Sequence, residues 1–185
     1  MRTVNLILVT LIVTGPLSLK LPSNPITVKG HVINNYKDSR VYVAGLSMFV
    51  KVSGRIVSQS TTDSNGDFSL RFTPTDKSSD FYCAGVGTDT LLLDSIERIE
   101  KDNVELTFHI PNAVKKDAFG KVYCPKCKRT NKVYPICYCD PPITVRRISS
   151  TGDTTYSRIY KGEYQAGTDV VGAAKYYCDR DKVQF

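Results

Sequence analysis

Residues 61–72 read Thr-Thr-Asp-Ser-Asn-Gly-Asp-Phe-Ser-Leu-Arg-Phe, which is a turn followed by a strand. The Asn-Gly pair is favoured where both central residues of a hairpin turn need positive φ. Phe68, Leu70 and Phe72 then alternate with polar residues, the period-two pattern of a strand with one buried face. This stretch therefore predicts a β-hairpin whose second strand faces a core.

The strand pattern continues on both sides of this hairpin. Apolar residues alternate with polar ones over Val104–Ile110, and further apolar stretches that read as strands cover Val41–Val57, Phe81–Val86 and Leu91–Leu93. Six or seven short strands over some ninety residues predict a mainly β fold, built around an Ig-like antiparallel β-sandwich of two sheets. Cys83 falls in one of these strands, and we expect it to be a buried free thiol.

Three stretches in this region carry a resemblance to one known family. They are Val28-Lys29-Gly30-His31-Val32, the tract Val43–Val52, and a T-D-x-x-G-x-F segment whose fixed positions are Thr62, Asp63, Gly66 and Phe68. Together they resemble the carboxypeptidase regulatory-like domain. The resemblance implies a transthyretin-like sandwich, which we assign to residues 25–112, and a module with no active site of its own.

Catalysis by a side-chain triad finds little support in the sequence. His31 and His109 are the only histidines, and nothing in the sequence positions them together beside a nucleophile. We therefore expect the protein not to be an enzyme.

The amino terminus has the pattern of an export signal. A short positive start is followed by an apolar run over Val4–Val13, which a Gly-Pro pair ends. A run of about ten residues is too short to span a bilayer, which needs roughly 20. We predict a signal peptide at residues 1–20, an extracytoplasmic location (periplasmic or secreted), and no transmembrane segment after its removal.

The charges divide the chain into two regions. Residues 21–112 carry 9 basic and 11 acidic side chains, whereas residues 113–185 carry 14 and 7. Five of the six cysteines also fall in the last third of the chain. These shifts predict a separate, small β module at residues 120–185.

The cysteines of this module have the spacing of a metal site. Cys124 and Cys127 form a C-x-x-C pair in a polar, basic stretch, and Cys178 with Asp181 forms a C-x-x-D pair downstream. Thiolates suit zinc, and a carboxylate oxygen can complete a tetrahedral site. We therefore predict a structural zinc ion bound by these four residues.

The same segments resemble a zinc-ribbon-like segment of small bacterial proteins. The resemblance is carried by Cys124-Pro125-Lys126-Cys127, Val133-Tyr134-Pro135-Ile136, Tyr138 and Lys175-Tyr176-Tyr177-Cys178-Asp179-Arg180-Asp181. In the ribbon pattern the last pair is C-x-x-C, and this chain has Asp181 in place of the final cysteine. Cys137 and Cys139 are therefore reserve ligands.

Two alternatives stay open for the cysteines. An exported protein with six cysteines can form disulfides, although the short loop between Cys137 and Cys139 favours bonds among Cys124, Cys127 and Cys178 instead. A C-P-x-C motif also occurs in redox proteins, so the competing function is an extracytoplasmic redox or electron-transfer protein.

Basic and aromatic residues alternate in the last third of the chain. They are Arg146, Arg147, Tyr156, Arg158, Tyr160, Lys161 and Tyr164. Such a surface suits a protein or an anionic glycan, and the export signal argues against nucleic acid as the partner. The sequence thus favours a non-catalytic, exported structural or interaction protein.

Overall fold

The computed structural model describes residues 24–35, 42–85, 88–111, 113–139, 142–166 and 174–185. Every regular element in these ranges is a β-strand, which confirms the prediction of a mainly β fold. The expected signal peptide at residues 1–20 lies outside the described residues. Among the residues that are described, no helix is long and apolar enough to cross a membrane.

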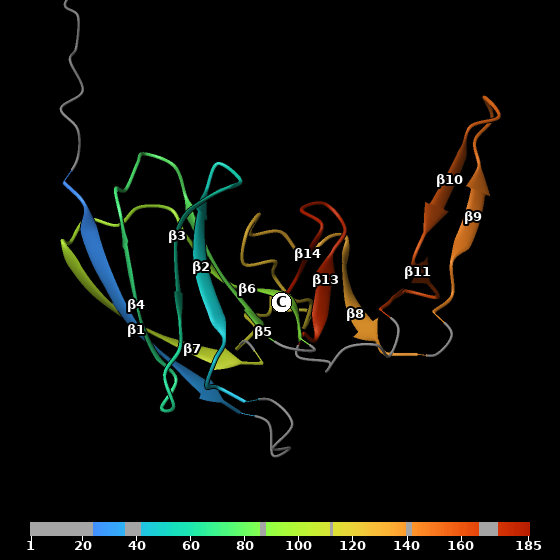
Figure 1. Cartoon of the computed structure of the whole chain (residues 1–185). Helices are drawn as coiled ribbons and strands as arrows, with labels where there is room; N and C mark the ends of the chain where they lie inside the picture. Colours follow the sequence, from blue (N-terminus) through green and yellow to red (C-terminus); the bar gives the residue numbers. More distant parts are fainter. Residues whose placement is uncertain (1–23, 36–41, 86–87, 112, 140–141, 167–173) are drawn as a thin grey trace, which may run out of the picture.

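Two sheets face each other and form the expected β-sandwich (Figure 1). One sheet has the order β4-β1-β7, and the other contains the run β6-β5-β2-β3. Their strands are β1 (Ile26–Asn34), β2 (Ser47–Val52), β3 (Arg55–Thr61), β4 (Asp67–Phe72), β5 (Ser79–Gly85), β6 (Thr88–Ile96) and β7 (Asn103–Ile110).

The core between the two sheets follows the alternation seen in the sequence. On β4, Phe68, Leu70 and Phe72 are buried and their neighbours are exposed. The Phe68 ring stacks on Phe108 of β7, with 6.0 Å between the ring centroids. Phe68 also pairs with Gly30 of β1, where a Cβ atom would come within 2.1 Å of the Phe68 ring. Gly30 therefore leaves the space that the Phe68 ring occupies.

The sheet that contains β2, β5 and β6 is buried on both faces. Phe81 and Cys83 of β5 belong to the sandwich core, whereas Tyr82 packs with Phe49 and Leu92 on the opposite face. The residues from the C-terminal part of the chain that complete this second core are Val122, Cys124, Cys178, Val183 and Phe185. Burial on both faces explains why these strands are nearly continuous apolar runs.

The C-terminal strands extend the sandwich. Strands β8 (Val133–Cys137), β11 (Ile159–Tyr160), β12 (Glu163–Gln165), β13 (Tyr176–Cys178) and β14 (Val183–Gln184) continue one sheet of nine strands. The junction is the parallel pairing of β14 with β6 through Gln184 and Leu91. The expected small β module is thus joined to the sandwich by backbone hydrogen bonds and by the second core.

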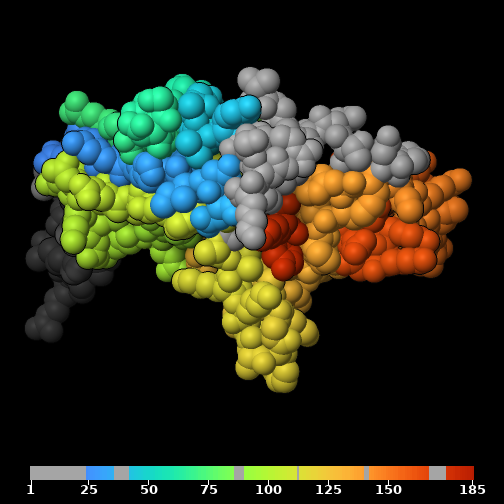
Figure 2. Space-filling view, turned by 90° about the horizontal axis from the view of Figure 1, so that it is seen from below, coloured from blue at the N-terminus to red at the C-terminus, as the bar shows by residue number. Residues whose placement is uncertain are grey.

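Two segments extend away from this body. The hairpin of β9 (Val145–Ile148) and β10 (Thr154–Ser157) forms a sheet of its own at one end of the molecule (Figure 1). The chain between β7 and β8 contributes a second projection, which Figure 2 shows in yellow. A tight turn from Asp117 to Gly120 lies in that stretch, and it leaves the Phe119 side chain 89% exposed.

Three details differ from the sequence-based expectation. The sandwich was expected to be antiparallel, but its β4-β1-β7 sheet is mixed because β1 and β7 pair in parallel. Parallel pairing is possible here because β1 and β7 lie far apart in the sequence and are not joined by a short hairpin. The stretch Val41–Val57 contains a tight turn between β2 and β3, at Ser53 and Gly54, which both have positive φ. In the turn before β4, by contrast, Gly66 has positive φ and Asn65 does not. The Asp63 carboxylate accepts backbone N–H groups of Asn65 and Asp67 in this turn, as Asp commonly does in turns.

Candidate metal centre

The structure brings four predicted ligands to one point. One donor atom each from Cys124, Cys127, Cys178 and Asp181 lies within 4.8 Å of all the others. The side chains of Cys124 and Cys178 are fully buried, and those of Cys127 and Asp181 are partly exposed. Two loops about fifty residues apart in the sequence therefore supply one cluster.

Both loops have the same local conformation. The backbone N–H groups of Lys126 and Cys127 point at the sulfur of Cys124, and those of Arg180 and Asp181 point at the sulfur of Cys178. The next residue after each loop is a lysine with positive φ: 55° at Lys128 and 54° at Lys182. Asp181 thus occupies in the second loop the position that Cys127 has in the first.

The distances within the cluster match a tetrahedral metal site. With metal–sulfur bonds of about 2.3 Å, two sulfur ligands lie about 3.8 Å apart, and a sulfur and an oxygen ligand about 3.5 Å apart. The Cys127 and Cys178 sulfurs are 3.9 Å apart. The Asp181 Oδ2 atom lies 3.3 Å from the Cys124 sulfur and 3.2 Å from the Cys178 sulfur. Three sulfurs and one carboxylate oxygen form a donor set that zinc accepts.

The protonation of the four groups also fits a cation site. Burial raises the pKa of the Cys124 and Cys178 thiols. The backbone N–H groups that point at each sulfur lower the pKa, but by less than burial raises it. At Asp181, burial raises the pKa, but the hydrogen bonds from the three thiols and the nearby Lys126 ammonium together lower it more. Asp181 is therefore an anion at neutral pH, and a bound metal would replace the thiol protons.

Basic side chains surround the cluster. The Arg180 guanidinium lies 3.6 Å from the Cys127 sulfur and also donates to the side-chain oxygen of Asn131, at 3.0 Å. A site with three thiolates and one carboxylate around a divalent cation has a net negative charge. The guanidinium offsets part of this charge and holds the two loops together.

Lys126 in the first loop and Lys128 directly after it fasten the loop to the sandwich. The Lys126 ammonium lies 2.8 Å from the buried carboxylate of Asp80 on β5. The other oxygen of Asp80 accepts a hydrogen bond of 2.6 Å from the Ser95 hydroxyl on β6. Lys128 donates to the backbone carbonyl of Ser95, at 3.2 Å. The loop is therefore held on the pair of strands that also borders the second core.

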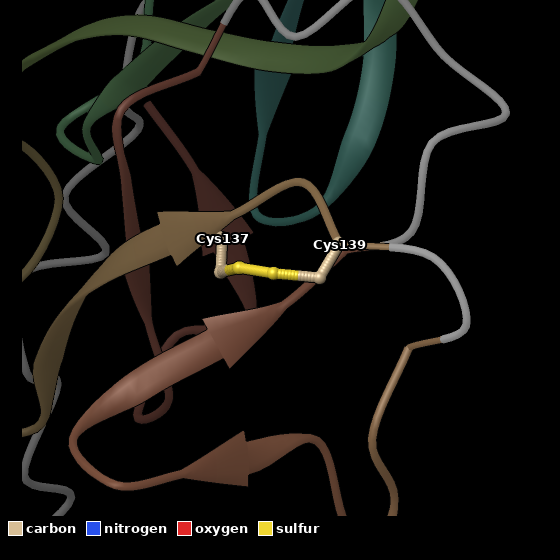
Figure 3. The surroundings of a disulfide bond; sticks show 2 residues. All are labelled: Cys137 and Cys139. Carbon is tan, nitrogen blue, oxygen red and sulfur yellow. A yellow bond between two sulfur atoms is a disulfide. The ribbon is translucent and has the colours of Figure 1, made fainter.

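Cys137 and Cys139 do not join the cluster. Their sulfurs form a disulfide, with the Cα atoms 5.5 Å apart, inside the usual range of about 4.4–6.8 Å (Figure 3). The expectation that Cys137 and Cys139 serve as reserve ligands is therefore wrong, and so is the alternative of disulfides among Cys124, Cys127 and Cys178, which stay free. Cys137 is the last residue of β8 and the chain bends after it, so the Cα atom of Cys139 comes closer than the roughly 6.6 Å that separates residues two apart in a strand.

The structure also bears on the alternatives for the remaining cysteines. Cys124, Cys127 and Cys178 are free thiols, and so is Cys83, which is buried in the sandwich core as expected. A redox centre of the C-P-x-C kind needs a helix that opens at the second cysteine. Turns and then β8 follow Cys127, and no helix occurs in the described part of the chain.

Asp80 and Ser95 are site residues that sequence reasoning missed. Asp80 stands beside an apolar run, Phe81-Tyr82-Cys83, yet its side chain is only 5% exposed. In the sequence, the signal for Asp80 is an acidic residue at the start of an apolar strand. If that strand is buried on both faces, its carboxylate needs a partner. The sequence does not indicate which lysine provides that partner.

Comparison with known proteins yields weak similarities. No family model matches the chain, and no curated protein matches it. Among solved structures, a mutant type II cohesin–X-dockerin complex from Acetivibrio cellulolyticus is 15% identical over 45% of this chain and 56% of that one, with a TM-score of 0.33. A 9R-lipoxygenase from Cyanothece PCC8801 is 12% identical over 60% of this chain and 20% of that one, with a TM-score of 0.32. The chain thus spans about half of the first and a fifth of the second, and TM-scores this low do not establish a shared fold.

Proposed function

We propose that Cys124, Cys127, Cys178 and Asp181 bind one zinc ion, which fixes the C-terminal part of the chain on the β-sandwich. The observation that carries this proposal is the convergence of three sulfurs and one carboxylate oxygen from two loops of matching conformation. Zinc would supply four bonds that cross-link these loops. Because the protein provides all four ligands, no position is left for a substrate, and the site is structural.

The position of the cluster supports this role. The C-terminal strands are short, and β14 pairs with β6 through a single pair of residues. Among the described residues, the second core, to which Cys124 and Cys178 belong, contains eight buried residues. A segment with so small a core needs an additional cross-link to stay folded, and a bound metal contributes folding free energy directly.

The remaining features support a non-catalytic, exported interaction protein. The carboxypeptidase regulatory-like signature, with Phe68 placed on Gly30, suggests a supporting module. The hairpin of β9 and β10 exposes Arg146, Arg147 and Tyr156 at the far end of the molecule. We propose that this hairpin and the rest of the basic C-terminal segment contact a protein or an anionic glycan outside the cytoplasm.

Native mass spectrometry of the full chain tests the zinc site. The wild-type protein should carry one zinc ion, and Cys124→Ser should lose it. The matched control is the double variant Cys137→Ser/Cys139→Ser, which removes two sulfurs outside the cluster and should keep the zinc ion. Iron with visible absorbance would support the redox alternative, and a metal-free wild-type protein would refute the zinc proposal.

The same variants test the structural role. Limited proteolysis of Cys124→Ser should cut residues 113–139 and 174–185 faster than in the wild-type protein. Equal resistance of the zinc-free and zinc-loaded proteins would contradict a structural role for the ion.

A further inference from the structure

One phenylalanine differs from the other six in the chain. The Phe119 side chain is 89% exposed, whereas each of the others is buried. The chain between β7 and β8, in which Phe119 lies, projects from the body of the molecule (Figure 2). A large apolar side chain at this position is available to a partner. The buried phenylalanines are Phe49, Phe68, Phe72, Phe81, Phe108 and Phe185.

The projecting turn, residues 115–123, holds Phe119 in a hydrogen-bonded backbone. The backbone N–H of Asp117 donates to the carbonyl of Lys121 at 2.9 Å, and that of Gly120 donates to the carbonyl of Asp117 at 3.0 Å. The Asp117 carboxylate accepts the backbone N–H groups of Phe119 and Lys121, at 2.9 and 2.8 Å. These bonds fix the backbone on both sides of the ring, so its exposure belongs to a defined turn.

The base of the projecting turn is anchored in the body of the protein. Val122 is buried in the second core, and Lys116 pairs with it in an antiparallel bridge. Cys124 of the metal centre follows directly after the turn. The turn is therefore a fixed part of the molecular surface.

Three lysines of the projecting turn carry free positive charges. Lys115, Lys116 and Lys121 are exposed, and in the part of the chain that the structure describes no carboxylate oxygen lies within 4.0 Å of their ammonium groups. Asp117 is the one acidic residue of the turn, and its carboxylate accepts the two backbone N–H groups named above. The turn thus combines an apolar tip with a positive charge.

The positive charges lie a short way behind the apolar tip. Lys121 is two residues from Phe119 and Lys116 is three, which along a fully extended chain correspond to at most about 7 and 11 Å. Interfacial segments bury their apolar groups about 5–10 Å into the boundary between headgroups and acyl chains, while cations near the surface attract anionic lipids. An aromatic ring with lysines behind it matches this order of layers.

A folded protein fits the same tip less well. A specific protein interface buries about 800 Å² on each side, and one aromatic side chain supplies about 150–250 Å² of it. A convex tip also needs a matching pocket in a folded partner, whereas a bilayer adapts to its shape. The shape and the charge together therefore favour a lipid surface.

We propose that the projecting turn binds the surface of a bilayer that contains anionic phospholipids. The Phe119 ring inserts among the headgroups, and the ammonium groups of Lys115, Lys116 and Lys121 pair with headgroup phosphates. Each lysine near such a surface strengthens binding roughly five-fold, and added salt weakens the attraction. This surface is distinct from the hairpin of β9 and β10, which we proposed above as a contact for a protein or an anionic glycan.

Tryptophan fluorescence of the full-length protein tests the contact at the tip. The sequence contains no tryptophan, so Phe119→Trp introduces a single fluorophore. Its emission should shift to shorter wavelength with vesicles of phosphatidylcholine and phosphatidylglycerol, and should not shift with phosphatidylcholine alone. The matched control is Tyr156→Trp, at an exposed aromatic position on β10, whose emission should not change.

Two results of this experiment would overturn the proposal. The first is an unchanged emission of the Phe119→Trp protein, which is also the result if the vesicles bind the apolar run Val4–Val13 instead. The second is an equal shift in the Phe119→Trp and Tyr156→Trp proteins, because the contact would then not be specific to the projecting turn.

Co-sedimentation with the same anionic vesicles measures the contribution of the ring. Phe119→Ser should weaken binding at least about 10-fold, because the apolar ring no longer leaves water on binding. Tyr156→Ser is the control and should bind as the wild type does. If the Phe119→Ser protein also binds as the wild type does, the ring is not inserted and the proposal is wrong.

A pair of double variants measures the contribution of the lysines. Lys116→Gln/Lys121→Gln should weaken vesicle binding at least about 10-fold. Lys29→Gln/Lys77→Gln removes the same charge from exposed positions of the sandwich and should change binding less than about two-fold. Equal losses in the two double variants would show that the net charge of the protein, and not this turn, attracts the bilayer.

Discussion

The Lys126 ammonium lies 2.8 Å from a carboxylate oxygen of Asp80, so an ion pair joins the loop of Cys124 and Cys127 to the sandwich. The Asp80 side chain is 5% exposed and that of Lys126 is 33% exposed. Removal of the lysine charge leaves Asp80 with the Ser95 hydroxyl as its remaining side-chain partner in the described structure. This contact makes the stability of the sandwich depend on a residue inside the C-P-K-C motif.

Lys126→Met should lower the free energy of unfolding by about 1–2 kcal/mol, because a buried carboxylate loses its counter-ion while one partner of the pair is partly solvated. Urea denaturation of the zinc-loaded protein measures the change. The control is Lys121→Met, an exposed lysine of the same segment, which should stay within about 0.5 kcal/mol of the wild type. Equal losses in the two variants would show that the ion pair with Asp80 contributes nothing.

Asp181 should determine the metal affinity. Asp181→Asn removes the anionic ligand and should weaken zinc binding at least about 10-fold, measured by competition with a chelator. Asp181→Cys completes a C-x-x-C pair in a loop that already has the matching conformation, so it should bind zinc more tightly than the wild type. Asp179→Asn is the control, since Asp179 pairs with Lys182 outside the cluster. If the two asparagine variants bind zinc equally, Asp181 is not a ligand.

The cysteines should react with a thiol reagent in three distinct groups. Burial raises the pKa of the Cys83 thiol to about 12, so only about one molecule in 10⁴ is ionised there at pH 8. We expect no rapidly reacting thiol in the zinc-loaded protein. Chelation should release the two loops that the ion cross-links and expose Cys124, Cys127 and Cys178, so that three thiols react; four should react in denaturant without reductant. Six reactive thiols in denaturant would show that Cys137 and Cys139 are not joined.

Gly30 and Phe68 should be coupled. Gly30→Ala places a methyl group where the Phe68 ring lies, and it should lower the free energy of unfolding by about 1–3 kcal/mol. Phe68→Leu gives the methyl group room, so Gly30→Ala should cost less in that background. A double-mutant cycle by thermal denaturation measures the difference. Additive losses would mean that the ring does not occupy this space.

The sandwich could be predicted from the sequence because its strands carry local signals. Phe68, Leu70 and Phe72 alternate with exposed residues, as a strand with one buried face requires. The pairing of β1 with β7 has no such signal, since it depends on contacts between the two ends of the domain. The apolar runs of β5 and β6 predicted strands, but burial on both faces and the C-terminal segment that covers the second face are seen only in the structure.

The four donors of the metal centre could also be predicted, because a tight loop fixes the spacing of two ligands. From the sequence, Cys137 and Cys139 were also possible ligands. The structure excludes them because they pair with each other in a disulfide at the end of β8. Asp80 could not be assigned a role, because its partner lies forty-six residues away in the sequence and the pair forms only when the second core is assembled.

X-ray absorption spectroscopy at the zinc edge tests the central claim most directly, because it reports the ligands of the bound ion. The wild-type protein should show three sulfur neighbours at about 2.3 Å and one oxygen neighbour at about 2.0–2.2 Å. Asp181→Cys should convert this shell to four sulfurs. A wild-type shell without sulfur, or one that Asp181→Cys leaves unchanged, would contradict the proposed zinc centre.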